Sequence, residues 1–418
     1  MAPASHPYLP RLVDPWLDEL SRELPALLIL GPRACGKTTT VERRAATTVR
    51  LDIEAQAAAF QADPDAALRG LAEPVLLDEW QNAPGVLGAV RRSINEDPRP
   101  NRFFVTGSVR AELENEVWAG TGRLVRVDMY PMTMRELERR TDGSTFFDRV
   151  ADGEELAVPH DPPDLRGYAE LALRSGFPMA ALLLSGVPRQ QWLESYIDDL
   201  LTHDVEQIED SQTRRRDRER LRRYFEAYVL NSAGAPEHKT LYDAAGINRK
   251  TAVAYDELVT SLLIAEQVPA WASNRLKRLT TTSKRYLIDP ALIGAALRLD
   301  VDGVLGDGDL LGRVIDTFVA SQLRPEAEIA TTRPRIHHLR SEQGRREVDV
   351  LVELAGQRLI GIEVKASASP NADDARHLVW LRDQMEGRFV AGVVFHTGPR
   401  IYELSERIIA APIAALWG

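Results

Sequence analysis

Short apolar runs that end in turn-forming or acidic residues alternate with longer helical patterns over the first 140 residues. The runs are PALLILG at 25–31, PVLLDE at 74–79 and RFFVTGS at 102–108. Continuous apolar runs of this length are typical of strands buried on both faces of a parallel sheet. Strands that alternate with helices predict an α/β domain built on such a sheet.

The pattern changes beyond residue 140. The segment TDGSTFFDRVADGEELAVPHDPPD combines Gly, Pro and Asp residues, which predicts a linker. Helical periodicity dominates the next stretch, and mixed patterns then return, with VDVLVEL, RLIGIEVKA and FVAGVVFH as candidate strands. We expect an α/β domain at 1–140, a helical region at 165–305 and a second α/β domain at 312–418.

Composition and charge limit the classes of protein to which this chain can belong. Its 418 residues are 44% hydrophobic, and no apolar run approaches the ~20 residues that a membrane span needs. The N-terminus shows no secretory pattern and there is one cysteine, so we expect a protein of the reducing cytoplasm. The net charge of −10 argues against a uniformly basic coat, whereas basic stretches at 214–223, 274–285 and 333–346 favour local basic surfaces.

A phosphate-binding motif follows the first predicted strand. GPRACGKT at 31–38 matches G-x-x-x-x-G-K-[ST] in full, with a strand before it and a helical pattern after it. Backbone N–H groups of such a loop surround phosphate oxygens, Lys37 supplies charge to the β- and γ-phosphates, and Thr38 offers a hydroxyl to Mg²⁺. The sequence thus predicts ATP and Mg²⁺ as cofactors, with nucleotide contacts from Gly31, Pro32, Arg33, Ala34, Cys35, Gly36, Lys37, Thr38 and Thr39.

Two acids close the second predicted strand. Asp78 is placed to hold Mg²⁺, and Glu79 is placed to orient the attacking water and to accept its proton. The neighbouring strand ends in polar residues, so Thr106 or Ser108 can sense the γ-phosphate or simply form a turn. Within the phosphate loop, we interpret Cys35 as a small filler residue in preference to a redox switch.

The segment TLYDAAGINRKTAVAYDELVTSLLI at 240–264 has the pattern of two helices joined by a turn. A short helix ends at Gly246, and Asn248 is placed to cap the next helix. The first turn of that helix, where recognition helices touch DNA, holds Arg249, Lys250 and Thr251. A hairpin with a basic tip follows, so we expect a winged-helix module at about 235–290 that also contacts DNA through Arg275, Lys277 and Arg278. A helical lid domain with incidental charge is the alternative.

A second group of chemically active residues lies in the third region. Alternation places Glu363 and Lys365 on one face of the strand LIGIEVKA. If this strand pairs with VDVLVEL as a hairpin, Asp349 can approach the same face. Two carboxylates can hold Mg²⁺, or Mn²⁺ in its place, by oxygen ligands. The lysine can orient a hydroxide nucleophile, so these residues are a candidate catalytic site.

Many segments, in their order, resemble those of bacterial and archaeal AAA-type ATPases that carry a C-terminal domain of unknown function. The segments are GPRACGKTT, LDIEAQAAAFQADPDAAL, VLLDEWQNAP, FFVTGSVR, GTGRLVRVDMYPMTMREL, GFP, KRYLIDPAL, GRVIDTFVASQL, EVDVLVE and IEVK. The resemblance covers nearly the whole chain. It implies a homo-oligomer in which Arg123, or else Arg110, reaches a nucleotide on a neighbouring subunit; either arginine can instead pair locally with an acid.

The third region also resembles the D-(x)n-E-x-K core of restriction-endonuclease-like enzymes. Such folds place a further acid on a preceding helix, where this chain has Asp316 in the segment GRVID. The ATPase family usually has a glutamate there, and the shorter aspartate keeps metal binding open. Cleavage of DNA and a degenerate domain that only binds DNA or protein both stay open.

Together these features predict a Mg²⁺-dependent ATPase that acts with DNA in repair, recombination or defence and has no membrane partner. Two other hypotheses stay open. One is a nucleotide-gated switch whose C-terminal domain binds protein partners, and the other is a nucleotide-regulated endonuclease.

Overall fold

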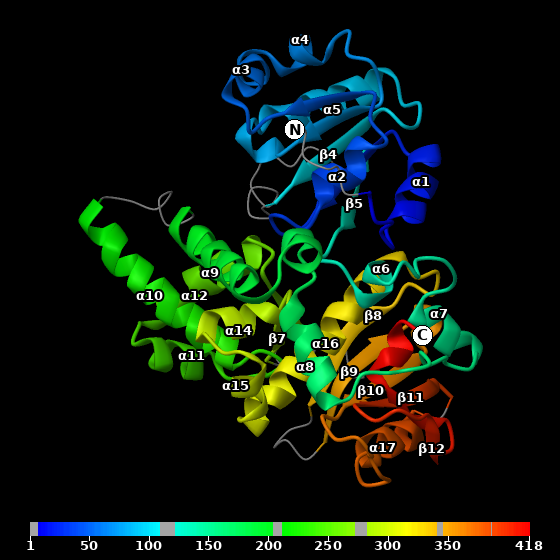
Figure 1. Ribbon diagram of the computed structural model, residues 1–418. Coiled ribbons are helices and arrows are strands. Elements are labelled where there is room, and N and C mark those ends of the chain that lie inside the picture. The colour runs from blue at the N-terminus through cyan, green and yellow to red at the C-terminus, as the bar shows by residue number, and fades with distance from the viewer. Residues whose placement is uncertain (1–6, 109–121, 204–210, 272–281, 341–345, 386) are drawn as a thin grey trace. The chain divides into compact units, whose positions relative to one another are not determined.

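The computed structural model describes residues 7–108, 122–203, 211–271, 282–340, 346–385 and 387–418 (Figure 1). The chain divides into two compact units. Unit 1 is Met1–Asp142 with Ser261–Leu263, and unit 2 is Gly143–Thr260 with Ile264–Gly418. The regions 165–305 and 312–418, which the sequence suggests as separate domains, lie almost wholly within unit 2.

Unit 1 is built on a five-stranded parallel sheet, which confirms the predicted α/β class. The strands lie in the order β2-β3-β4-β1-β5, with bounds β1 Ala26–Leu30, β2 Thr47–Arg50, β3 Val75–Asp78, β4 Phe103–Gly107 and β5 Leu124–Asp128. Its helices are α1 Asp14–Glu23, α2 Lys37–Glu42, α3 Glu54–Ala62, α4 Pro64–Leu68, the 3-10 helix η1 Trp80–Asn82, α5 Gly85–Glu96 and α6 Met134–Leu137. Every residue of β1, β3 and β4 is buried, which explains their continuous apolar sequences.

The strand order decides which loops meet at the carboxyl end of this sheet. Because β4 lies between β1 and β3, the end of β4 separates the loop after β1 from the acids at the end of β3. In register, Val105 pairs with both Leu28 and Leu77. The loop after β1 needs glycine at Gly31, because a Cβ atom there would lie 2.1 Å from the Met129 carbonyl oxygen.

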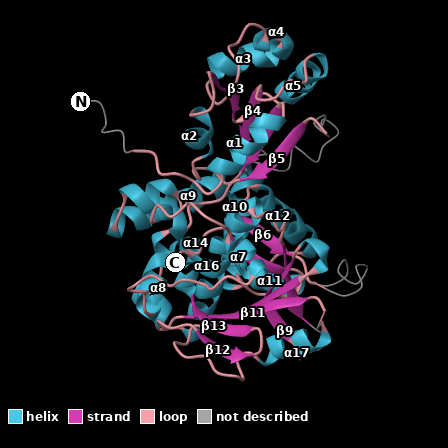
Figure 2. Ribbon diagram, turned by 90° about the vertical axis from the view of Figure 1, so that its right-hand side faces the viewer, coloured by secondary structure: helices cyan, strands magenta, loops and turns pink. Residues whose placement is uncertain are grey.

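Unit 2 combines helices with two sheets (Figure 2). The six-stranded sheet has the order β12-β13-β11-β10-β9-β8, with bounds β8 Arg335–Arg340, β9 Glu347–Glu353, β10 Leu359–Val364, β11 Phe389–His396, β12 Tyr402–Ser405 and β13 Ile408–Pro412. The two-stranded sheet is antiparallel and consists of β6 Ala265–Val268 and β7 Lys284–Leu287. The helical segments are α7 Phe146–Asp152, α8 Leu165–Arg174, η3 Met179–Leu183, α9 Gly186–His203, α10 Ser211–Leu230, α11 His238–Ala245, α12 Arg249–Ser261, α14 Ala291–Leu297, α15 Val301–Leu305, α16 Gly308–Ile329, η5 Ala355–Gln357, α17 Arg376–Gln384 and η6 Ile413–Leu416.

The pairing of β9 with β10 is antiparallel, so the condition for Asp349 to approach Glu363 is met. The register joins Ile362 to Val350 and Gly361 to Leu351, so the next position sets Asp349 across from Glu363. Helix α16 packs against both β7 and β10. One end of the six-stranded sheet therefore meets both a long helix and the small two-stranded sheet.

Candidate functional site

The phosphate loop of unit 1 connects β1 to α2. Gly36 has a left-handed backbone with φ 100°, and the helix begins at Lys37. The buried Lys37 ammonium donates to the carbonyl oxygens of Gly31 and Pro32, both at 3.0 Å. The loop therefore holds its ammonium group against its own backbone, next to the N-terminus of α2, where phosphate groups are favoured.

The predicted magnesium ligands lie together. The Thr38 hydroxyl donates to Asp78 Oδ1 at 2.9 Å, and the Thr106 hydroxyl donates to the same carboxylate. Burial raises the pKa of Asp78, while the hydrogen bonds from Thr106 and Thr38 oppose this shift. A hydroxyl beside a carboxylate is a set of hard oxygen donors, which fits Mg²⁺.

The side chain of Glu79 is held by one residue of η1 and by the residue that follows β4. Its backbone is left-handed, with φ 57° and ψ 57°, an uncommon conformation for a residue other than glycine. Its Oε2 atom accepts hydrogen bonds from Ser108 Oγ at 3.0 Å and from Gln81 Nε2. The sequence interpretation identified Ser108 but missed Gln81, which lies two residues beyond the acid. The result is a fixed carboxylate beside the candidate magnesium ligands.

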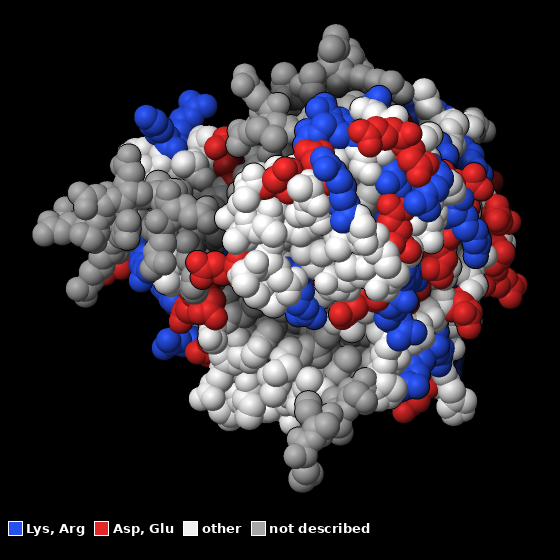
Figure 3. Space-filling model, turned by 90° about the horizontal axis from the view of Figure 1, so that it is seen from above, with Lys and Arg blue, Asp and Glu red and all other residues white. Residues whose placement is uncertain are grey.

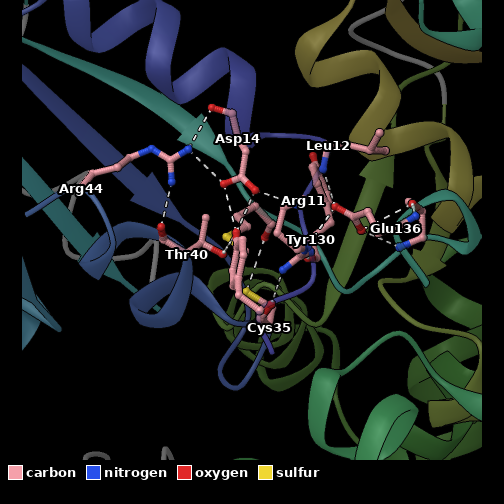
Figure 4. Close-up of polar contacts among 11 residues, drawn as sticks. Arg11, Leu12, Asp14, Cys35, Thr40, Arg44, Tyr130 and Glu136 are labelled. Carbon is pink, nitrogen blue, oxygen red and sulfur yellow. Dashed lines mark hydrogen bonds and ion pairs between the residues drawn. The ribbon is translucent and has the colours of Figure 1, made fainter. Parts of the chain in front are cut away.

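A buried arginine that the sequence interpretation missed braces the phosphate loop (Figure 4). Arg11 donates from Nη1 to the Cys35 carbonyl oxygen at 2.9 Å, and from Nη2 to the Tyr130 carbonyl oxygen at 2.8 Å. Its Nε atom donates to Glu136 Oε1 at 2.9 Å. Burial alone would lower the pKa of Arg11, but Glu136 outweighs it and the pKa is raised. The guanidinium thus ties the loop backbone to α6.

The one signal in the sequence for this network is local. Thr133 and Glu136 form a capping box at the start of α6, in which the Thr133 hydroxyl accepts from the Glu136 N–H and the Glu136 carboxylate accepts from the Thr133 N–H. That spacing identifies the helix start. It does not reveal that the other oxygen of Glu136 accepts from Arg11.

The segment before α1 is also bound to α2. The Tyr8 hydroxyl donates to Asp14 and to Thr40 Oγ1, and Arg44 donates to the Thr40 carbonyl oxygen at 2.8 Å. Burial raises the pKa of Tyr8 to about 12, so its hydroxyl stays a donor at neutral pH. Cys35 is fully buried, with Sγ 3.7 Å from the Met129 carbonyl oxygen, a location that suits a small filler residue.

We predict that Arg11→Met lowers the free energy of unfolding of the nucleotide-free protein by about 3–5 kcal/mol, because Glu136 is left buried and unpaired. Chemical denaturation followed by circular dichroism measures this change. The double variant Arg11→Met/Glu136→Gln should lose less than the sum of the two single changes, since the pair acts as a unit. Additive losses would contradict a direct ion pair.

The two candidate arginines have different outcomes. Arg123 is exposed and donates from Nε to Asn95 Oδ1 at 3.1 Å. It directly precedes β5, and Ala26 pairs with Leu124, so it lies at the amino end of the sheet. The phosphate loop follows the carboxyl end of β1, about 17 Å away at the usual rise of a strand. Arg123 therefore does not serve the nucleotide site of its own subunit, and Arg110 lies outside the described residues.

The helix-turn-helix pattern is present in unit 2. Helix α11 ends before Gly246, which has φ 65°, and Asn248 Oδ1 accepts from the Thr251 backbone N–H at 2.9 Å. Arg249 and Lys250 are exposed at the start of α12. The antiparallel pair of β6 with β7 follows. Arg275, Lys277 and Arg278 lie outside the described residues.

The predicted acids of unit 2 also come together. Asp349 Oδ2 accepts from the Val364 backbone N–H at 3.0 Å, and Lys365 donates to Glu363 Oε2 at 2.9 Å. Asp316 joins them through Lys284, whose ammonium lies 2.7 Å from Asp316 Oδ2. The sequence interpretation missed this lysine. Among the described residues there is no group of three or more His, Cys, Asp or Glu arranged to hold a metal ion.

The surface charges are mixed. Figure 3 shows Lys and Arg side chains interspersed with Asp and Glu side chains on the face that it displays. On this face the mixture of charges agrees with the net charge of −10. None of the described helices is both long enough and apolar enough to cross a membrane.

Comparisons with known proteins match three parts of the chain. A family model described as an AAA domain matches residues 23–138, and two families described as domains of unknown function, DUF8612 and DUF4143, match residues 165–303 and 311–416. The uncharacterized proteins Rv2008c of Mycobacterium tuberculosis and Mb2031c of Mycobacterium bovis are each 27% identical over 401 residues, covering 93% of this chain and 80% of each relative. The Walker-type ATPase PABY2304 of Pyrococcus abyssi is similar in structure at a TM-score of 0.41, with 14% identity, covering 68% of this chain and 94% of that chain.

The AAA match and the parallel sheet with its phosphate loop agree. Both support a P-loop ATPase domain in the N-terminal part of the chain, which the sequence predicted. The matches to the rest of the chain carry no described activity.

Proposed function

We propose that this protein is a Mg²⁺-dependent ATPase whose nucleotide cycle acts on DNA. The observation that carries the ATPase part is the group formed by Thr38, Asp78 and Thr106 beside the buried ammonium of Lys37. Thr38 lies in the first turn of α2, Asp78 ends β3 and Thr106 lies in β4, and each offers an oxygen of the kind that a magnesium–triphosphate complex needs.

We assign the residues around this group different roles in hydrolysis. Lys37 binds the β- and γ-phosphates, and Thr38 with Asp78 holds the magnesium ion, which neutralises charge on the phosphates. Glu79 orients a water molecule and takes its proton as the water attacks the γ-phosphorus. Ser108 keeps the Glu79 carboxylate pointed toward this water.

DNA is the partner that we favour for unit 2. The support is the short turn between α11 and α12, with exposed Arg249 and Lys250 at the start of the second helix. A helix N-terminus that carries cations also contributes its own positive end, so both features attract phosphate. The antiparallel β6–β7 pair follows in the position that a winged-helix module requires.

Reversing the charge of Arg249, Lys250, Arg275, Lys277 and Arg278 is expected to weaken duplex DNA binding. The slope of log Kd against log salt should fall by about 0.9 for each DNA phosphate that the variant no longer neutralises. Fluorescence anisotropy at several salt concentrations measures both effects. Lys239→Glu, an exposed change on α11, is the matched control. An unchanged slope in a folded variant would show that DNA does not bind to this surface.

One further measurement tests whether DNA binding is coupled to ATP hydrolysis. The ATP hydrolysis rate should rise with one of four DNA forms, namely single strands, duplexes, forks and four-way junctions, and the charge-reversed variant should lose this stimulation while keeping its basal rate. Equal rates with and without every DNA form would leave an ATPase that does not act on DNA.

One observation favours a second function, a nucleotide-gated switch that binds a protein. Unit 2 exposes four apolar side chains within nine residues, namely Met179, Leu182, Leu183 and Val187, which are 40–62% exposed. Exposed apolar groups that lie close together mark surfaces for other proteins. Absence of DNA binding, together with ATP-dependent association of the chain with itself or another protein, would select this function. A homo-oligomer is also the setting in which Arg123 can reach a nucleotide.

A further inference from the structure

The acidic cluster of unit 2 already contains a buried cation. We define the cluster as Asp316, Asp349 and Glu363. Lys284, the first residue of β7, places its Nζ atom 2.7 Å from Asp316 Oδ2 and 3.3 Å from Asp349 Oδ1. Its side chain is only 3% exposed. The ammonium group therefore lies between the two carboxylates that would have to share a metal ion.

The remaining oxygens of these carboxylates have other donors. Tyr286 donates its hydroxyl to Asp316 Oδ1 at 3.0 Å, and the Val364 N–H donates to Asp349 Oδ2. A hard divalent cation takes about six oxygen ligands. Each oxygen of Asp316 and Asp349 already accepts a hydrogen bond, so a metal ion would have to compete with the Lys284 ammonium for the lone pairs that remain.

The net charge of the cluster also disfavours a bound divalent cation. Three carboxylates face two ammonium groups, those of Lys284 and Lys365, so the cluster has a formal charge of −1. The Lys284 ammonium lies within ion-pair distance of two of these carboxylates, and Lys365 pairs with the third. Adding a divalent cation would leave a net positive charge in a buried place, which is unfavourable.

Lys284 is fixed by its surroundings. Its backbone pairs with Val268 in the β6–β7 sheet, and its ammonium lies 5.3 Å from the centre of the Tyr286 ring. The lysine belongs to the part of the chain that matches one family, at 165–303, whereas all three acids belong to the part that matches another, at 311–416. One side chain therefore joins the two regions inside unit 2.

We propose that Lys284 is the resident counter-ion of this acidic cluster, occupying the place of a divalent cation, and that it fastens the β6–β7 sheet to the C-terminal sheet. The acidic cluster therefore supports no metal-dependent cleavage in this protein. The proposal concerns unit 2 alone and does not depend on ATP hydrolysis.

The first test needs no change at Lys284. Mn²⁺ binding to the full, nucleotide-free chain is measured by the electron paramagnetic resonance signal of free Mn²⁺, in an Asp78→Asn background that removes the candidate ligand in unit 1. Asp349→Asn should leave the amount of bound Mn²⁺ unchanged. A site that disappears with Asp349→Asn would overturn the proposal, and so would Asp349-dependent nicking of DNA.

The second test removes the counter-ion. Lys284→Ala in the same background should lower the unfolding temperature and create a Mn²⁺ site at least about tenfold tighter than any in the parent, because the acids lose their neutralising charge. Mn²⁺ should then recover part of the lost unfolding temperature, and adding Asp349→Asn should abolish both effects. Lys365→Ala, which removes the other and more exposed ammonium group, is the matched control and should gain less. A folded Lys284→Ala variant that gains no site would overturn the proposal.

Discussion

Lys37→Ala is expected to reduce ATP turnover by about 100-fold or more and to weaken ATP binding as well. The ammonium is a buried positive charge at the centre of the loop, where it donates to the carbonyl oxygens of Gly31 and Pro32. We expect the ammonium to exchange these two hydrogen bonds for ones to phosphate oxygens when a nucleotide binds. A coupled phosphate-release assay measures turnover, and the fluorescence of a nucleotide analogue measures binding.

The control for this change is another cation of unit 1. Arg92→Ala removes an exposed charge on α5 that pairs with Asp65 at the surface, so turnover should stay near the wild-type rate. Full activity in Lys37→Ala would show that the triphosphate does not bind in this loop.

Glu79→Gln should slow hydrolysis by about 10²–10⁴-fold while ATP binding is retained, because the amide cannot accept the proton of the attacking water. The shape of the site should survive, since the amide oxygen of glutamine can still accept from Ser108 Oγ. Single-turnover hydrolysis and nucleotide binding, measured on the same preparation, separate the two effects.

A matched acid provides the comparison for this variant. Glu54→Gln changes an exposed carboxylate in the first turn of α3 and should leave the hydrolysis rate unchanged. If Glu79→Gln hydrolyses ATP at the wild-type rate, another group positions the water. Ser108→Ala should then also be silent, because its one role in this scheme is to hold Glu79.

The sequence was informative where function depends on contiguous residues. The phosphate loop could be predicted because its chemistry needs glycines, a lysine and a hydroxyl at fixed spacing, and β1 and β3 could be predicted because both of their faces are buried. The placement of Glu363 and Lys365 on one face of the strand LIGIEVKA could be predicted from side-chain alternation. In each case, a local rule is enough to specify the structure.

The sequence was uninformative about ion pairs between residues that lie far apart in the chain. An arginine in the segment PRLVDPW carries no sign that it will be buried, and its carboxylate partner lies 125 residues away. Lys284 lies at the start of a short strand, 32 residues before Asp316 and 65 before Asp349. The topology of the fold brings such pairs together. The periodicity of apolar residues and the spacing of motifs in the sequence do not predict them.

The ion pair between Arg11 and Glu136 limits where the chain can be divided into expression fragments. The AAA match spans residues 23–138, and a fragment cut to those limits would omit Arg11 and the Tyr8 hydroxyl. A fragment that stops short of residue 136 would instead strand a guanidinium in the interior, which is strongly destabilising. During synthesis, Arg11 cannot complete its hydrogen bonds until Glu136 in α6 has been added to the chain. An expression fragment of unit 1 that keeps these hydrogen bonds must therefore begin before Tyr8 and end after α6.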